Sequence, residues 1–111
     1  MDFTVSLKKN DDFRRVYKTG KAASDGLLVV FVLKNGLGVN RLGISVSKKM
    51  GNAVLRNRQR RRIKEAYRAL ETALNTGYDI VINPKVPLAT VPFLQITKGL
   101  EGLLKRRGLL K

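Results

Sequence analysis

The sequence predicts a small mixed α/β protein whose elements follow the order helix, strands, helix, strand, helix. Three observations carry the prediction: compact apolar runs at 27–34 and 78–82, a strictly alternating stretch at 41–47, and one long helical pattern at about 53–73. A helix between two strands favours a crossover unit. The 111 residues suit one domain, residues 1–111, built around one modest core.

The first predicted helix covers "NDDFRRVYKTGK", residues 10–21. Asn10 is suited to cap its amino end, and Gly20 is suited to close the other end in the left-handed conformation. The apolar side of this helix consists of Phe13, Val16 and Tyr17.

The predicted strands differ in how they are buried. The β-branched and aromatic run "LLVVFVLK" lies between Gly26 and the turn-like "NGLG", which is typical of a buried strand. The run "YDIVI" has the same character, and the prolines of "NPKVP" end it. The stretch "RLGISVS" alternates, so one of its faces is apolar and the other is flat and polar. The apolar face carries Leu42, Ile44 and Val46, and the polar face carries Gly43, Ser45 and Ser47.

The long helix at about 53–73 has Asn52 as its expected cap and "NTG", which ends in Gly77, as its stop. At 100° per residue its apolar side chains fall within an arc of roughly 120°, so this stripe is expected to dock on the sheet. The stripe consists of Leu55, Ile63, Ala66, Tyr67, Leu70 and Leu74.

A last helix is predicted at about 91–107, with Thr90 as its cap and Pro92 in its first turn. Its helical spacing places Phe93, Ile96, Leu100, Leu103 and Leu104 on one side. Among the aromatic residues we assign Phe31, Phe93 and Tyr67 to the core.

The charge balance points to a polyanionic partner. Lys and Arg number 23 against 8 Asp and Glu, which gives a formal net charge of +15. Such a chain repels itself unless a polyanion neutralises it, so nucleic acid is the expected partner. No apolar run reaches the roughly 18 residues of a membrane span, and the start is charged too early for a secretory signal, so we expect a cytoplasmic protein without a membrane partner.

The missing residue types narrow the chemistry. There is no Cys and no His, which excludes disulfides, thiol nucleophiles, cysteine-based zinc sites and the commonest general base. Five Asp and three Glu are a poor basis for a metal cluster or for cleavage of phosphodiesters by the protein itself. We therefore predict no catalytic residue and no metal ligand in the chain.

The stretch "LRNRQRRRIKE", residues 55–65, is the strongest sign of RNA binding. Arg56, Arg60 and Lys64 repeat a like charge at a spacing of four, which costs a helix a few tenths of a kcal/mol per pair, whereas a solubilising helix mixes signs. Arginine also favours forked contacts to phosphate oxygens. Lys48 and Lys49 precede the helix start and suggest a second phosphate contact, although a plain loop with two exposed lysines explains them too.

The block "GISVSKKMGNAVLRNRQRRRIKEAYR" and the opening "LKKNDDFRRVYKTGK" resemble the protein subunit of bacterial ribonuclease P. The resemblance implies an α/β (α+β) two-layer sandwich with a mixed sheet and a left-handed parallel crossover, against the usual right-handed rule. It also implies an endoribonuclease in which a large RNA removes the 5′ leader of precursor tRNA. Mg²⁺ in such an enzyme is held mainly by the RNA and the substrate, and the protein is an accessory.

Carried over by position, the resemblance implies two sets of site residues. One set binds the ribonuclease P RNA: Lys48, Lys49, Arg56, Asn57, Arg58, Arg60, Arg61, Lys64 and Arg68. The other set binds the single-stranded leader of precursor tRNA in a cleft between the first helix and the sheet: Phe13, Tyr17, Ser45 and Ser47. Bases stack on aromatic rings, and small residues let a backbone approach. Whether Phe13 belongs to the core or to the cleft stays open, as does the role of Arg62, where the family tends to have an apolar residue.

Three other functions compete with this interpretation. A ribosomal or general RNA-binding protein explains the charge without a leader cleft. A DNA-binding helix-turn-helix protein needs a helix directly before the basic one, where the alternating strand lies, so a DNA partner is not expected. A protein-only nuclease would hydrolyse RNA without any partner RNA.

Overall fold

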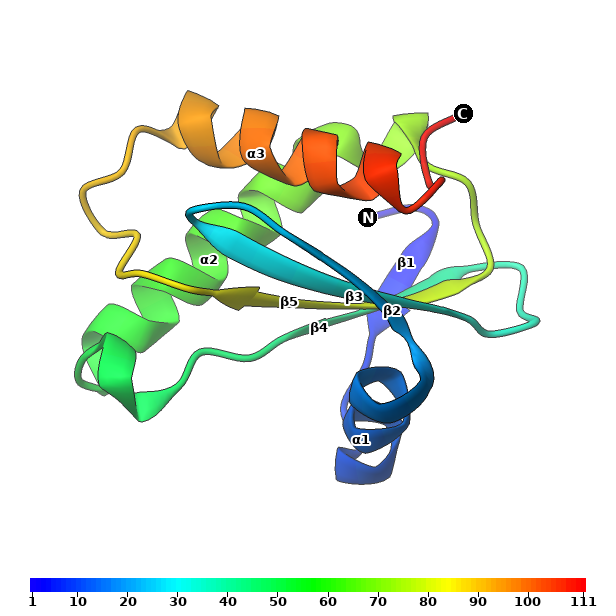
Figure 1. Ribbon diagram of the computed structural model, residues 1–111, viewed down its shortest axis with the longest axis horizontal. Coiled ribbons are helices and arrows are strands. Elements are labelled where there is room, and N and C mark those ends of the chain that lie inside the picture. The colour runs from blue at the N-terminus through cyan, green and yellow to red at the C-terminus, as the bar shows by residue number, and fades with distance from the viewer.

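The computed structural model describes residues 1–111 and contains five strands and three α-helices (Figure 1). The predicted order of helix, strands, helix, strand, helix is confirmed, with one short strand added before the first helix and one after it. The elements are β1 (Thr4–Ser6), α1 (Asn10–Thr19), β2 (Lys21–Ser24), β3 (Leu28–Lys34), β4 (Asn40–Ile44), α2 (Ala53–Leu70), β5 (Tyr78–Pro84) and α3 (Phe93–Arg106). Short 3₁₀ turns at Lys48–Met50 and Glu71–Ala73 flank α2.

The sheet is mixed, with the strand order β1-β4-β5-β3-β2. β4 runs parallel to both β1 and β5, whereas β3 is antiparallel to β5 and to β2. The crossover from β4 through α2 to β5 is left-handed: in Figure 1 both strands run leftward, α2 returns above them, and β5 lies nearer the viewer than β4. This confirms the hand that the family resemblance implied and departs from the common right-handed connection.

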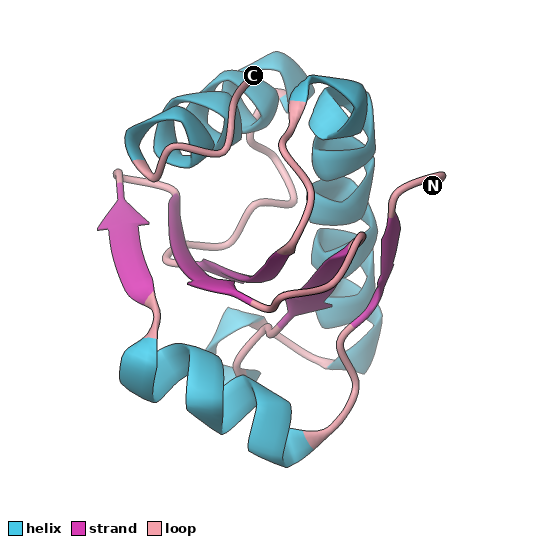
Figure 2. Cartoon of the chain, turned by 90° about the vertical axis from the view of Figure 1, so that its right-hand side faces the viewer, coloured by secondary structure: helices cyan, strands magenta, loops and turns pink.

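The two faces of the sheet are covered unequally. α2 and α3 lie on one face and α1 lies alone on the other (Figures 1 and 2). The α2/α3 face holds a cluster of 18 buried residues, which includes Val30, Ile63 and Ile80. The α1 face holds a cluster of only three buried residues, which are Leu7, Val16 and Val81. Apolar burial, worth about 25 cal/mol per Å², therefore anchors α2 and α3 far more firmly than α1.

α2 is a capped, amphipathic helix, as predicted. The Asn52 side chain accepts a hydrogen bond from the backbone N–H of Leu55 at 2.9 Å, which caps the first turn. The predicted stripe is confirmed from Ile63 to Leu74, but Leu55 is only half-buried. The helix ends at Leu70 instead of about 73, because a 3₁₀ turn follows it, and Gly77 lies in the turn before β5.

Three other caps were wrongly predicted. Asn10 is the first residue of α1 and caps nothing with its side chain. Gly20 has φ −74°, so it does not close α1 in the left-handed conformation. A Cβ at Gly20 would lie 2.5 Å from the carbonyl oxygen of Val16, so glycine serves close packing here. α3 begins at Phe93 after Pro92, and Thr90 does not cap it.

Burial corrects two of the predictions for single residues and strand ends. Tyr67 is fully buried as predicted, and Phe31 is half-buried on the α1 face. Phe93 is 43% exposed, so its assignment to the core was wrong. β4 ends at Ile44 instead of reaching 47, although the backbone N–H of Ser45 still donates to the carbonyl of Ile82 at 3.1 Å.

The amino-terminal segment is fixed to the end of α2. The Glu71 side chain is 5% exposed and accepts hydrogen bonds from the backbone N–H groups of Asp2 and Phe3 at 3.0 and 3.4 Å. The Thr4 hydroxyl lies 2.8 Å from the hydroxyl of Tyr67. β1 therefore takes its place at the sheet edge through contacts with α2 as well as through pairing with β4. None of the helices combines the length and the hydropathy that a membrane span needs.

Candidate nucleic-acid interface

Few carboxylates of the chain pair with the basic residues of α2. Of the five ion pairs in the chain, only one involves this helix, between Arg68 and Glu65 at 3.8 Å, and both partners are exposed. Arg60 donates to the side-chain oxygen of Asn57 at 2.7 Å and keeps its full charge. Because all of these cations except Arg68 lack an acidic partner, they are available to an external polyanion.

The structure exposes most of the predicted RNA-binding residues. Arg56 and Arg60 are half-buried, and the Nε of Arg56 is buried without a hydrogen-bond partner. The pair Lys48 and Lys49 lies in the 3₁₀ turn just before the start of α2. The predicted residues that are exposed are Lys48, Lys49, Asn57, Arg58, Arg61, Lys64 and Arg68.

Arg62 departs from the other basic residues of α2 because it bonds within the chain. Its guanidinium donates to the backbone carbonyls of Leu88 and Val91, in the segment between β5 and α3. The role that the sequence left open is therefore structural. An apolar residue at this position could not make these two hydrogen bonds.

Gln59 also bonds the segment between β5 and α3, and the sequence analysis did not identify it. It is 1% exposed, its amide nitrogen donates to the carbonyls of Met50 and Leu55 at 2.9 and 3.3 Å, and its oxygen accepts from the N–H of Leu88 at 3.1 Å. Buried polar groups need such partners. A signal was present in the sequence, because Gln59 lies on the apolar stripe between Leu55 and Ile63. Together Gln59 and Arg62 fix the amino-terminal half of α2 against the loop before α3.

The predicted leader cleft lies on the α1 face of the sheet, and Phe13 closes part of it. The half-buried Phe13 ring packs so tightly over Gly43 that a Cβ there would lie 2.5 Å from the ring. This part of the floor is therefore covered by Phe13, and the expected flat surface at Gly43 is not open. Phe13 belongs partly to the packing of α1 and partly to the surface.

Tyr17 lies on the same face and is partly exposed. The side chain is 37% exposed, and its hydroxyl donates to the side-chain oxygen of Asn83 at 3.1 Å. Its ring meets Phe31 edge-on, with centroids 4.9 Å apart. Ser45 and Ser47 follow the end of β4, where Ser45 is half-buried and Ser47 is exposed.

Phe31 and Asn83 are members of this surface that the sequence analysis missed. Alternation along β3 places Leu28, Val30 and Val32 in the main core, which sends Phe31 to the opposite face. That alternation could have been read from "LLVVFVLK", where a buried strand was predicted without assigning faces.

An ionic network fixes the first turn of α1 to the sheet. Arg41 donates from Nε and Nη2 to both carboxylate oxygens of Asp79, at 2.7 and 2.6 Å, and its Nη1 lies 3.6 Å from a carboxylate oxygen of Asp12 in α1. Asp79 is 1% exposed and also accepts a hydrogen bond from the Asn35 amide at 3.0 Å. Arg15 bonds Asp12 from within α1. The network compensates for the small apolar cluster under this helix.

The pKa values follow from these contacts. Burial alone raises the pKa of Asp79, but the hydrogen bonds from Arg41 and Asn35 and the charge of Arg41 outweigh it, so the pKa lies below its usual value. The Asp79 hydrogen bond raises the pKa of Arg41 in turn. Burial raises the pKa of Tyr67. No group of three or more acidic side chains is placed to hold a metal ion.

Comparisons with known proteins agree with the motif resemblance. A family model described as Ribonuclease P matches residues 1–108. The ribonuclease P protein component of Clostridioides difficile (strain 630) is 49% identical over 109 residues, which cover 96% of this chain and 96% of that protein.

Solved structures share the fold as well. The RNase P protein from Thermotoga maritima has a TM-score of 0.83 at 35% identity and covers 91% of this chain and 96% of its own. A Staphylococcus aureus RNase P protein mutant with defective mRNA degradation activity has a TM-score of 0.83 at 38% identity, with coverages of 95% and 89%.

Proposed function

Because the chain belongs to the ribonuclease P protein family, we propose that it binds the catalytic RNA of a ribonuclease P ribonucleoprotein and the 5′ leader of precursor tRNA. Endonucleolytic removal of the leader is carried out by that RNA, and the protein raises the affinity for the precursor. The whole chain acts as one RNA-binding domain in the cytoplasm. The observation that carries the proposal is the row of cations on α2 that no carboxylate of the chain neutralises, apart from the exposed pair of Arg68 with Glu65.

The proposed contact with the catalytic RNA uses phosphate binding. Arg58, Arg61 and Lys64 are exposed and form no ion pair, so each can neutralise a phosphate and release a counterion. The remaining members of the predicted RNA-binding set flank them on the same helix and on the turn before it. Arg56, Arg60 and Lys64 repel one another in the free helix, and RNA binding reduces this repulsion.

The proposed leader contact uses the α1 face. Tyr17 and Phe31 offer an aromatic edge, Asn83 offers a polar side chain, and Ser45 and Ser47 lie at the end of the adjacent strand. A single strand has unpaired bases whose faces stack on aromatic rings for about 1–3 kcal/mol each. Mature tRNA lacks this strand, so a contact here favours the precursor over the product.

Mg²⁺ enters this proposal through the RNA and the substrate. The chain offers no cluster of acidic side chains that fits a resident metal ion, so no protein residue is assigned to it. The protein's own part is to bind, orient and neutralise phosphates.

The experiment is reconstitution with the organism's ribonuclease P RNA at low Mg²⁺. Adding the protein should tighten binding of precursor tRNA relative to mature tRNA, measured with labelled RNAs in parallel. Tyr17→Ala should weaken this preference while leaving affinity for the catalytic RNA nearly unchanged. Equal affinity for precursor and mature tRNA would identify a general RNA-binding protein instead.

The phosphate contacts are tested by salt dependence. Arg58→Ala and Arg61→Ala should each weaken binding to the catalytic RNA and reduce the slope of log K against log salt by about one unit. Lys34→Ala removes an exposed cation at the end of β3 and serves as the matched control. A slope that stays the same in the α2 variants would remove the phosphate assignment.

The purified chain is also tested alone on RNA. The Staphylococcus aureus structure belongs to a mutant with defective mRNA degradation activity, so a nuclease control is needed here. Under the present proposal the protein alone leaves precursor tRNA intact. Cleavage that copurifies with the protein and persists without the catalytic RNA would support the protein-only nuclease.

A further inference from the structure

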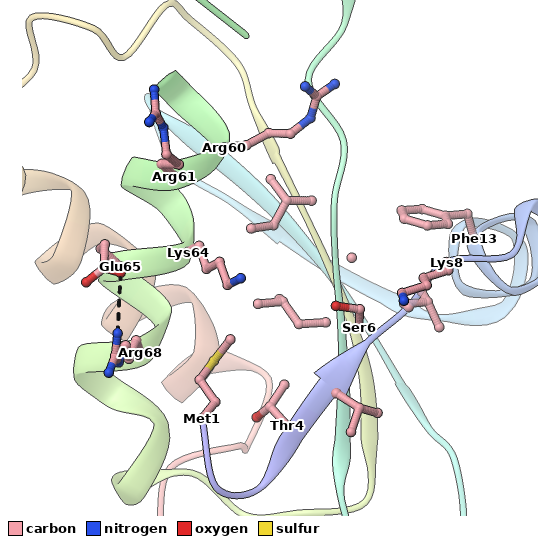
Figure 3. A pocket seen from close by; sticks show the side chains of 15 residues that line it. Met1, Thr4, Ser6, Lys8, Phe13, Arg60, Arg61, Lys64, Glu65 and Arg68 are labelled. Carbon is pink, nitrogen blue, oxygen red and sulfur yellow. Dashed lines mark ion pairs between the residues drawn. The ribbon is translucent and has the colours of Figure 1, made fainter. Parts of the chain in front are cut away.

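A groove runs between α2 and β1, along the edge of the sheet where β1 pairs with β4 (Figure 3). Its volume is about 850 Å³, within the roughly 300–1,000 Å³ of small-ligand pockets. α2 forms one wall, and the segment from Met1 to Lys8 forms the other. Figure 3 shows Arg60, Lys64 and Lys8 around the same space.

The groove exists because β1 is shorter than its neighbour. β1 pairs with β4 only as far as Ser6 opposite Leu42, whereas β4 continues to Ile44. The edge of β4 at Gly43 and Ile44 therefore has no strand beside it. Leu42 and Ile44 supply an apolar floor, and the Phe13 ring closes the far end.

The groove is strongly basic above this floor. Five cations line it against a single acid, Glu65, which pairs with Arg68 at 3.8 Å. Lys8 stands on the wall opposite α2, is exposed, and forms no ion pair. The five cations are Lys8, Arg60, Arg61, Lys64 and Arg68.

The apolar floor offers a contact that a phosphate group alone does not use. A duplex presents phosphates to a helix face but keeps its bases stacked inside, so it could not use the apolar floor of Leu42 and Ile44. A ligand that fits both parts carries a flat apolar face and a negative charge together. An unpaired ribonucleotide has this chemistry, and the Ser6 hydroxyl at the rim can bond a 2′-hydroxyl or a base edge.

We propose that the groove between α2 and β1 binds an unpaired nucleotide that the catalytic RNA extrudes from its fold. The inference rests on the proposed function for the identity of that RNA. It adds a single-strand site that borders the leader surface at Phe13, with the base over Leu42 and Ile44 and the phosphates between Lys8 and α2.

The first test uses the protein alone with a short single-stranded RNA and a hairpin of equal length, followed by fluorescence anisotropy. Lys8→Glu should weaken binding of the single strand by at least about fivefold, with a salt slope lower by about one unit. Lys34→Glu makes the same charge change outside the groove and should leave the preference for the single strand unchanged. An equal loss in both variants, or no loss in Lys8→Glu, overturns the proposal.

The floor is tested without a change of charge. Ile44→Ser should reduce the preference for single strand over hairpin and leave the salt slope as it is. Circular dichroism and urea unfolding confirm that this variant is folded. If it does not fold, Ser6→Ala, at the exposed rim, replaces it. A preference that the folded variant leaves unchanged contradicts the proposed base contact.

The second test identifies the RNA. The chain contains no cysteine, so Ser6→Cys gives one unique attachment point for a photoactivated cross-linker. In the reconstituted complex, cross-links from this position should map to an unpaired nucleotide of the catalytic RNA, while Lys34→Cys should not reach it. Cross-links only to paired nucleotides, or only to the tRNA leader, would refute the assignment.

The two proposals can fail independently. A protein that does not tighten binding of precursor tRNA would contradict the proposed function, yet the oligonucleotide test of the groove would still stand. A protein that supports the precursor preference but shows no dependence on Lys8 would contradict the groove alone.

Discussion

Replacing Arg41 with methionine should destabilise the fold and loosen α1. Methionine keeps much of the aliphatic length but removes the forked contact to Asp79 at 2.7 and 2.6 Å and the charge beside Asp12. Asp79 is 1% exposed, so its carboxylate would remain buried with only the hydrogen bond from Asn35. The substitution therefore leaves the buried Asp79 carboxylate without its cationic partner.

The size of the effect follows from the exposure of the pair. Breaking a buried pair by removing one partner costs about 3–5 kcal/mol, and a hydrogen bond to a charged group contributes about 1.5–3 kcal/mol. The Arg41 side chain is 24% exposed, so water can reach part of the site and reduces the cost. We expect a loss of about 2–4 kcal/mol in the free energy of unfolding at pH 7.

The pH dependence gives a second check with a defined sign. The pKa of Asp79 in the folded protein lies below its usual value, so Asp79 stabilises the fold above the ordinary aspartate range and loses this contribution as the pH falls from that range through the lower pKa of the folded protein. Without Arg41, burial raises the pKa and the carboxyl is protonated sooner. The deficit of Arg41→Met should therefore be largest at pH 7 and should shrink on acidification.

The assay is urea unfolding followed by circular dichroism at several pH values, with constant sulfate because the net charge is +15. The double variant Arg41→Met/Asp79→Asn removes both charges and should recover at least half of the loss. A loss below about 0.5 kcal/mol, the range of an ordinary surface substitution, would refute the reasoning. So would a deficit that stays constant between pH 7 and pH 4.

Three further predictions concern the same fold. Gln59→Ala should lower the free energy of unfolding by about 2–3 kcal/mol in urea titrations, because it leaves a buried backbone N–H of the loop before α3 without a partner; a loss under 0.5 kcal/mol would contradict this. Gly20→Ala should cost about 1–3 kcal/mol, since its Cβ would lie 2.5 Å from a backbone oxygen, whereas Gly102→Ala, in open space within α3, should gain about 0.5–1 kcal/mol. Sulfate should raise the melting temperature more than chloride at equal ionic strength, because the +15 charge repels itself; equal shifts would argue against anion binding.

The sequence predicted the long helix and the inner strands because each leaves a periodic pattern over many residues. β1 and β2 escaped prediction because "TVS" and "KAAS" are too short for any periodicity. They are strands only because β4 and β3 pair with them. Phe93 fits the helical spacing of α3, but the helix begins there, and this residue remains exposed.

The candidate site was predictable where charge alone decides it. The cations of α2 could be named from "LRNRQRRRIKE", because too few acidic residues lie nearby in the sequence to neutralise them. Arg62 could not be assigned, because its two carbonyl partners lie 26 and 29 residues further along the chain. The contact of Arg41 with Asp79 depends on the register of β4 against β5, which the sequence does not reveal.

The attachment of the amino terminus to Glu71 has a consequence for biogenesis. The hydrogen bond from Asp2 spans 69 residues, so the backbone N–H groups of Asp2 and Phe3 lack their Glu71 acceptor until the end of α2 has also left the ribosome. At roughly 5–20 residues per second, that delay amounts to about 3–14 s. During the later part of this interval β1 is held by its pairing with β4 alone, and the repulsive net charge of the nascent chain helps to keep it apart from its neighbours.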